Sequence, residues 1–136
     1  MIEQIKESFL SEFPNGWISF SDSNVGGNKT LFIRFGAVPK DEIPNGIVQN
    51  DPLFSILSIE SDLLIKHCNG SLSIDPKPGS FLAMDRVRTT LRKKKAKNEE
   101  DVVKYLKNYF KRVRKIVAEN ADNVYGRQRY SQDYFS

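Results

Sequence analysis

Apolar residues recur at helical spacing in two segments of the chain. The first covers residues 2–13, where charged side chains occupy the opposite side. Its apolar positions are Ile2, Ile5, Phe9, Leu10 and Phe13. The second begins after Asn98, a favourable N-cap residue, and continues to about residue 119. Its apolar stripe consists of Val102, Leu106, Tyr109, Val113 and Ile116, flanked by Val103, Phe110 and Val117. The pattern predicts two amphipathic helices.

Between these helices the pattern is that of short strands and turns. Residues 17–21 alternate between apolar and polar, and Gly26-Gly27-Asn28 turns the chain toward residues 30–35, which predicts a β-hairpin. Residues 53–59 predict a further strand, and residues 63–74 a second hairpin around the turn Asn69-Gly70. Another extended segment is expected over residues 81–93. Three prolines among turn-forming residues predict a long loop over residues 38–52.

This order of elements predicts an α+β domain. We expect an N-terminal helix, an antiparallel sheet of about five or six strands, and a long C-terminal amphipathic helix packed on one face of the sheet. The chain has 136 residues, which is the size of a single domain. We place this domain at residues 1–119. Residues 120–136 are polar with late aromatic residues, and we expect a C-terminal tail that is docked or flexible.

The composition indicates where in the cell the protein is expected and whether it carries a cofactor. The N-terminal residues lack the apolar run of a signal peptide, and no apolar stretch reaches the roughly 20 residues that a membrane span requires. A single cysteine, Cys68, cannot form an internal disulfide, and with one histidine, His67, the chain lacks the ligands of a Cys/His zinc site. We therefore expect a cytoplasmic protein that binds no membrane and carries no cofactor.

The net charge of +4 conceals an uneven distribution along the chain. Residues 1–85 contain six basic and eleven acidic residues and carry −5, residues 86–115 contain 13 basic and three acidic residues and carry +10, and residues 116–136 carry −1. The three acids of the middle block stand in the first turn of the predicted C-terminal helix, where the helix dipole favours them. The positive charge is thus concentrated on one predicted strand and one predicted helix.

Within the predicted strand, alternation places four basic side chains on one face. They are Arg86, Arg88, Arg92 and Lys94. Residues two apart on a strand are separated by about 7 Å, which is close to the spacing of phosphates in a partly extended single strand. Such a row fits a polyanion.

On the predicted helix, basic side chains fall opposite the apolar stripe. They are Lys104, Lys107, Lys111, Arg114 and Lys115, with Arg112 at the flank. No acidic residue occurs from 102 to 118, whereas a merely solvated face usually mixes both signs. In the tail, Tyr125 and Tyr130 stand near basic residues, a composition suited to stacking on bases, although these rings are equally suited to docking the tail on the sheet.

Residues that would support catalysis are scarce. His67 and Cys68 are adjacent, so on a strand their side chains would point to opposite faces and form no nucleophile–base pair. Gly26-Gly27 lacks the sequence context of a phosphate-binding loop. The acids of the long loop, at 41, 42 and 51, lack calcium-loop spacing. We expect no enzyme, with a metal-dependent hydrolase lacking a recognisable motif as the alternative.

These observations predict a small non-enzymatic binding protein. Its basic residues between 86 and 115 would engage nucleic acid of unspecified type through the phosphate backbone. An adaptor, inhibitor or chaperone-like protein that docks its basic pole on an acidic protein is the alternative, and pairing of opposite poles between two copies of the chain is a third. The same charges also fit a solvated helix face with ion pairs to the acids of residues 1–85.

Overall fold

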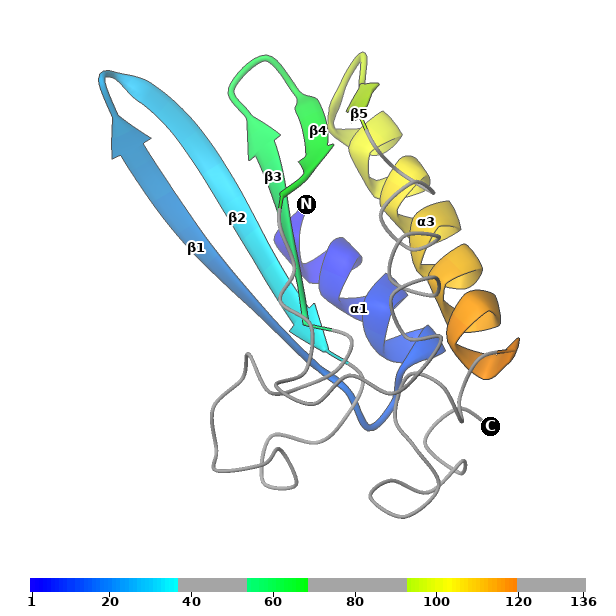
Figure 1. The fold of residues 1–136 in the computed structure, drawn as a ribbon. Coiled ribbons are helices and arrows are strands. Elements are labelled where there is room, and N and C mark those ends of the chain that lie inside the picture. Colours follow the sequence, from blue (N-terminus) through cyan, green and yellow to red (C-terminus); the bar gives the residue numbers. More distant parts are fainter. Residues whose placement is uncertain (37–53, 69–92, 120–136) are drawn as a thin grey trace, which may run out of the picture.

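The structure is a computed structural model that describes residues 1–36, 54–68 and 93–119. These described residues form two helices, α1 (Ile2–Glu12) and α3 (Glu99–Glu119). Its five strands are β1 (Trp17–Val25), β2 (Asn28–Gly36), β3 (Ser55–Glu60), β4 (Leu64–His67) and β5 (Lys93–Lys95). The strands form one antiparallel sheet in the order β1-β2-β3-β4-β5 (Figure 1). The predicted α+β class is confirmed.

Both predicted helices form, within a residue or two of their expected ends. Two side chains cap the start of α3: the Asp101 amide donates to Asn98 Oδ1 (2.9 Å), and the Lys97 amide donates to Asp101 Oδ2 (3.0 Å). The three acids of the first turn also lie where the helix dipole favours negative charge. Local sequence alone therefore determines where α3 begins.

The predicted hairpin around Gly26-Gly27 is confirmed and is longer than expected. β1 and β2 pair along nine residues each, from Trp17 opposite Gly36 to Val25 opposite Asn28. Both turn glycines have positive φ, 63° and 81°, the conformation required by a tight two-residue turn that follows the strand twist. Glycine adopts this conformation without a steric penalty.

The second predicted hairpin is wrong in its strand pairing. A turn at Asn69-Gly70 would pair β4 with residues 71–74, but β4 pairs with β3 on one side and β5 on the other. Ile65, for example, lies opposite Ile59 and Lys94. The chain instead reverses between β3 and β4, where the Leu63 amide donates to the Glu60 carbonyl (2.9 Å). Residues 69–70 themselves lie outside the described ranges.

The core lies between the sheet and the helices, and Phe9 of α1 is at its centre. Its ring packs against Phe13 at 5.3 Å between centroids, against Phe35 of β2 at 5.4 Å and against Phe110 of α3 at 5.3 Å. Phe110 also meets Phe35 edge to face at 5.5 Å. These rings join α1, α3 and the sheet, which confirms that the C-terminal helix packs on one face of the sheet.

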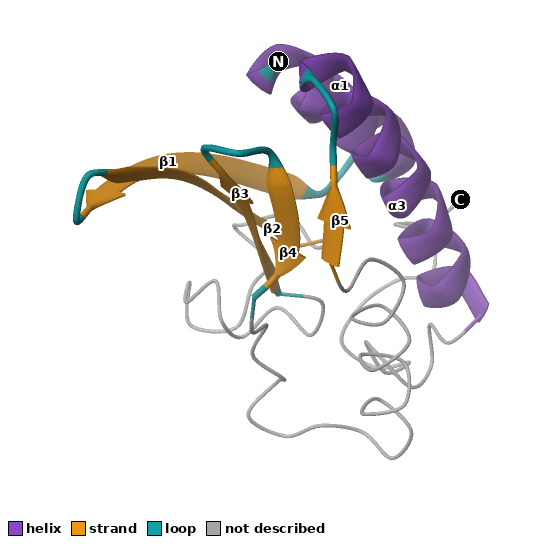
Figure 2. Cartoon of the chain, turned by 90° about the horizontal axis from the view of Figure 1, so that it is seen from above, coloured by secondary structure: helices purple, strands orange, loops and turns teal. Residues whose placement is uncertain are grey.

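A smaller cluster lies on the opposite face of the sheet. Trp17 and Phe54 are both buried and stack with centroids 6.1 Å apart, and Ile56 packs beside them. Both helices lie on the other side of the sheet, and the tip of the β1–β2 hairpin projects beyond them (Figure 2). The sheet therefore has a helix-covered face and an open face.

Several predicted segments fall outside the described residues. They are the loop 38–52, the residues 71–74, the extended segment up to residue 92 and the tail 120–136. Within the described part, no helix is long and apolar enough to cross a membrane.

Candidate nucleic-acid interface

The side of α3 that faces away from the core carries four exposed lysines. We call Lys104, Lys107, Lys111 and Lys115 the lysine face. Lys104, Lys111 and Lys115 are separated by seven and four residues, so they lie on one line along the helix. At 1.5 Å per residue this line is about 16 Å long. The buried residues Val102, Leu106 and Val113 occupy the other side, as the spacing predicts.

In the described residues, the ion pairs lie outside the lysine face. Lys66 Nζ is 2.7 Å from Glu60 Oε1, and Lys95 Nζ is 3.0 Å from Asp62 Oδ2. The hydrogen bond with Glu60 raises the pKa of Lys66, and the hydrogen bond with Lys95 lowers the pKa of Asp62. Across residues 1–36, 54–68 and 93–119, no carboxylate lies within 4.0 Å of a lysine of the lysine face. The charge of that face is not neutralised from within this part of the chain.

The two arginines predicted with these lysines occupy different positions. Arg112 is exposed, as expected at the flank. Arg114 is half-buried and lies toward α1 rather than opposite the apolar stripe. Partial burial lowers the pKa of Arg114, and the nearby negative charge of Glu12 acts in the opposite direction. No local pattern in the sequence predicts this position, because Glu12 comes near Arg114 only when the two helices pack.

The edge strand β5 lies beside α3 (Figures 1 and 2). All three of its residues, Lys93, Lys94 and Lys95, are exposed. Lys94 lies opposite the buried Ile65, so it is on the helix-covered side, and its Nζ is 5.4 Å from the centre of the Tyr105 ring of α3. This is a cation–π contact between the two basic elements.

The alternation in the sequence predicts Lys94 for this surface but neither Lys93 nor Lys95. Strand alternation places Lys93 and Lys95 on the open face, and Lys95 is engaged by Asp62. Lys93 is therefore a further exposed basic side chain of this edge. The predicted residues Arg86, Arg88 and Arg92, and the predicted stacking residues Tyr125 and Tyr130, lie outside the described residues.

His67 and Cys68 stand at the end of β4. The His67 Nδ1 atom contacts the main-chain carbonyl oxygen of Cys68, and the Cys68 amide donates to the carbonyl of Ile56 (2.8 Å). The imidazole thus interacts with the backbone of its neighbour. In the part of the chain that the structure describes, no three His, Cys, Asp or Glu residues are grouped so as to hold a metal ion.

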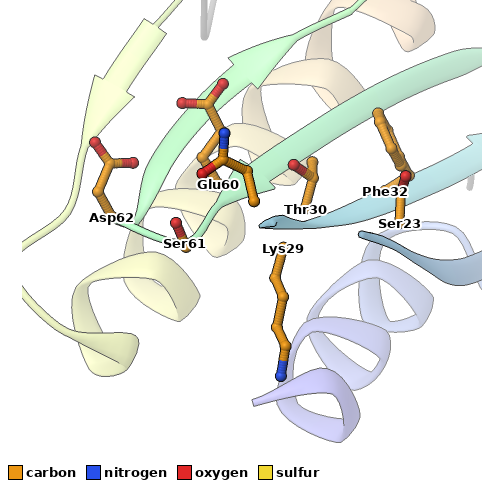
Figure 3. A pocket seen from close by; sticks show the side chains of 8 residues that line it. Ser23, Lys29, Thr30, Phe32, Glu60, Ser61 and Asp62 are labelled. Atoms are coloured by element: carbon orange, nitrogen blue, oxygen red, sulfur yellow. The ribbon is translucent and has the colours of Figure 1, made fainter. Parts of the chain in front are cut away.

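A polar hollow of about 500 Å³ lies near the tip of the β1–β2 hairpin (Figure 3). Its lining includes Ser23, Thr30 and Phe32 from the hairpin, and Glu60 and Asp62 from the end of β3. The carboxylates of Glu60 and Asp62 pair with lysines, as described above. Lys29 also lines this hollow, so its walls carry charges of both signs, and it is separate from the lysine face.

The chain was compared with protein-family models, with curated proteins and with solved structures, and none of them matches.

Proposed function

We propose that the protein binds nucleic acid through the phosphate backbone, using the lysine face of α3 together with Lys94 of β5. The observation that carries this proposal is the row of exposed lysines about 16 Å long, with no carboxylate partner among the described residues. Lysines bind phosphates as point charges without fixed geometry, so we expect little sequence preference.

The length of the row sets the number of phosphates it can contact. If each of the four lysines of the lysine face neutralises one phosphate, log K falls with log salt with a slope of about −3.6 for duplex DNA and about −2.8 for a single strand. Between 50 and 200 mM salt, the affinity would then fall about 150-fold for a duplex and about 50-fold for a single strand. Additional contacts from β5 would make the slope steeper.

The test is a set of fluorescence anisotropy titrations of the full chain with single-stranded DNA, duplex DNA and RNA over this range of salt. Binding with a log–log slope of about −3 or steeper supports the proposal. The absence of binding to all three at about 50 mM salt would refute it. A protein that binds an acidic polypeptide but no nucleic acid would show that the basic surface serves a protein partner instead.

A further inference from the structure

The two edges of the sheet differ in how they are protected. β5 forms one edge of the described sheet, its described residues Lys93–Lys95 are all lysine, and it lies beside α3. Lysine side chains and a covering helix are features that keep a strand edge from pairing with another chain. β1 forms the other edge of the described sheet, with nine residues that include Ile18 and Phe20, and Asp22 is its one charged residue. β1 has no lysine and no proline.

The outer edge of β1 presents backbone groups at alternate residues, and the sheet register identifies them. The Cys68 amide donates to the Ile56 carbonyl, so the backbone groups of Ile56 point toward β4. Arg34 lies opposite Ile56 and therefore points the other way, toward Ser19 of β1. The serines of β1 thus bond to β2, and the outward groups belong to Ile18, Phe20, Asp22 and Asn24.

We propose that β1 pairs with β1 of a second copy of this chain, in antiparallel orientation about a two-fold axis. The pair would extend the sheet across both copies. In the described part of the chain, β2 is the one strand that pairs with β1. We commit to a second copy because β1 carries only one charge, so pairing with itself brings together little like charge. In the pairing described below, the two Asp22 carboxylates are diagonal neighbours and are not directly opposite each other. This proposal does not depend on nucleic-acid binding.

The geometry also selects the register. Pairing centred on Ser21 matches all nine residues of one β1 with all nine of the other. The outward backbone of Phe20 then meets Asp22 of the second copy, and Ile18 meets Asn24 of the second copy, as two hydrogen-bonded pairs. The two Phe20 rings become diagonal neighbours on the helix-covered face, a position within reach of aromatic side chains.

Apolar side chains on the helix-covered face of the hairpin remain partly exposed, which favours a partner beside β1. Ile18, Phe20 and Leu31 pack against the core but are only partly buried. The hairpin extends away from both helices toward its tip (Figure 2). A second hairpin beside β1 would cover more of Ile18 and Phe20, because the sheet would continue past them.

The first test measures the mass of the full chain by light scattering over a series of concentrations. We expect twice the 15.6 kDa of the monomer as concentration rises. Asp22→Pro removes one outward amide while leaving the bonds to β2 in place, and we expect it to be monomeric with an unchanged circular dichroism spectrum. Asp22→Val is the matched control, because it removes the same carboxylate but keeps the amide, and it should remain dimeric. A wild-type protein that is monomeric at all concentrations, or an Asp22→Pro dimer as strong as the wild type, overturns the proposal.

The second test fixes the register without relying on a proline. In a Cys68→Ser background, Ser21→Cys would lie opposite its own copy across the two-fold axis, at a Cα separation of about 4.5 Å that a disulfide can bridge. We expect a disulfide-linked dimer on mild oxidation. Lys29→Cys in the same background is the control, because it is exposed on β2 and away from the axis. Equal cross-linking of both variants would show non-specific collision and would contradict this register.

Discussion

Replacing Phe9 by alanine should cost more stability than almost any other single change in α1. The Phe9 side chain is fully buried and makes three ring contacts at 5.3 to 5.4 Å, one each with Phe13, Phe35 and Phe110. Truncating a buried phenylalanine typically costs about 3–5 kcal/mol, since the transfer energy is lost and a cavity remains. This loss is a large part of the roughly 5–15 kcal/mol that stabilises a typical domain.

The assay is urea unfolding followed by circular dichroism. With a slope of about 2 kcal/mol per molar urea, Phe9→Ala should lower the unfolding midpoint by about 2 M. Ile2→Ala is the matched control in the same helix, because Ile2 is 39% exposed, and we expect a change within about 0.5 kcal/mol. If both variants unfold at the same midpoint, Phe9 does not join α1 to the sheet and to α3 as described.

Three further predictions concern the ends of elements and one ion pair. Asn98→Ala should cost about 1 kcal/mol in the same assay, because it removes the cap of α3, and an unchanged midpoint would argue against that cap. Gly16→Ala should cost about 1–3 kcal/mol, because an added Cβ would lie 2.7 Å from the Gly36 carbonyl oxygen; a neutral effect would contradict this close approach. Lys95 lowers the pKa of Asp62, so the pair stabilises the fold near neutral pH, and this contribution is lost as the pH falls through that lowered pKa. In an NMR titration, Lys95→Gln should move the Asp62 midpoint upward, and an unmoved midpoint would refute the pairing.

The elements that sequence predicted well are those determined by local interactions. The spacing of apolar residues defines α3, and Asn98 with Asp101 defines its first turn. Gly26-Gly27 defines the turn of the β1–β2 hairpin for the same reason. The partner of β4 was predicted wrongly because the Asn69-Gly70 turn signal favours pairing with the residues that follow it. β5 is distant from β4 in the sequence, and only tertiary packing brings Lys94 beside Ile65.

The candidate interface was predictable in part. Helical spacing was sufficient to group the lysines of the lysine face, and the structure keeps all four exposed. The position of Arg114 beside Glu12 and of Lys94 over Tyr105 depends on how α3 packs against α1 and β5, which no local pattern encodes. The second cluster, of Trp17 and Phe54, was missed for the same reason, since Trp17 lies on β1 and Phe54 directly precedes β3.

The most direct test of the proposed interface compares two charge-matched double variants in salt titrations with duplex DNA. Lys104→Gln/Lys111→Gln removes two charges from the lysine face, and Lys6→Gln/Lys29→Gln removes two exposed charges from α1 and the hairpin. If the lysine face contacts phosphates, the first variant should reduce the magnitude of the log–log slope by about 1.8 and weaken binding about 60-fold at 0.1 M salt, while the second keeps the wild-type slope. Equal slopes for the two variants would contradict the assignment of nucleic-acid binding to α3.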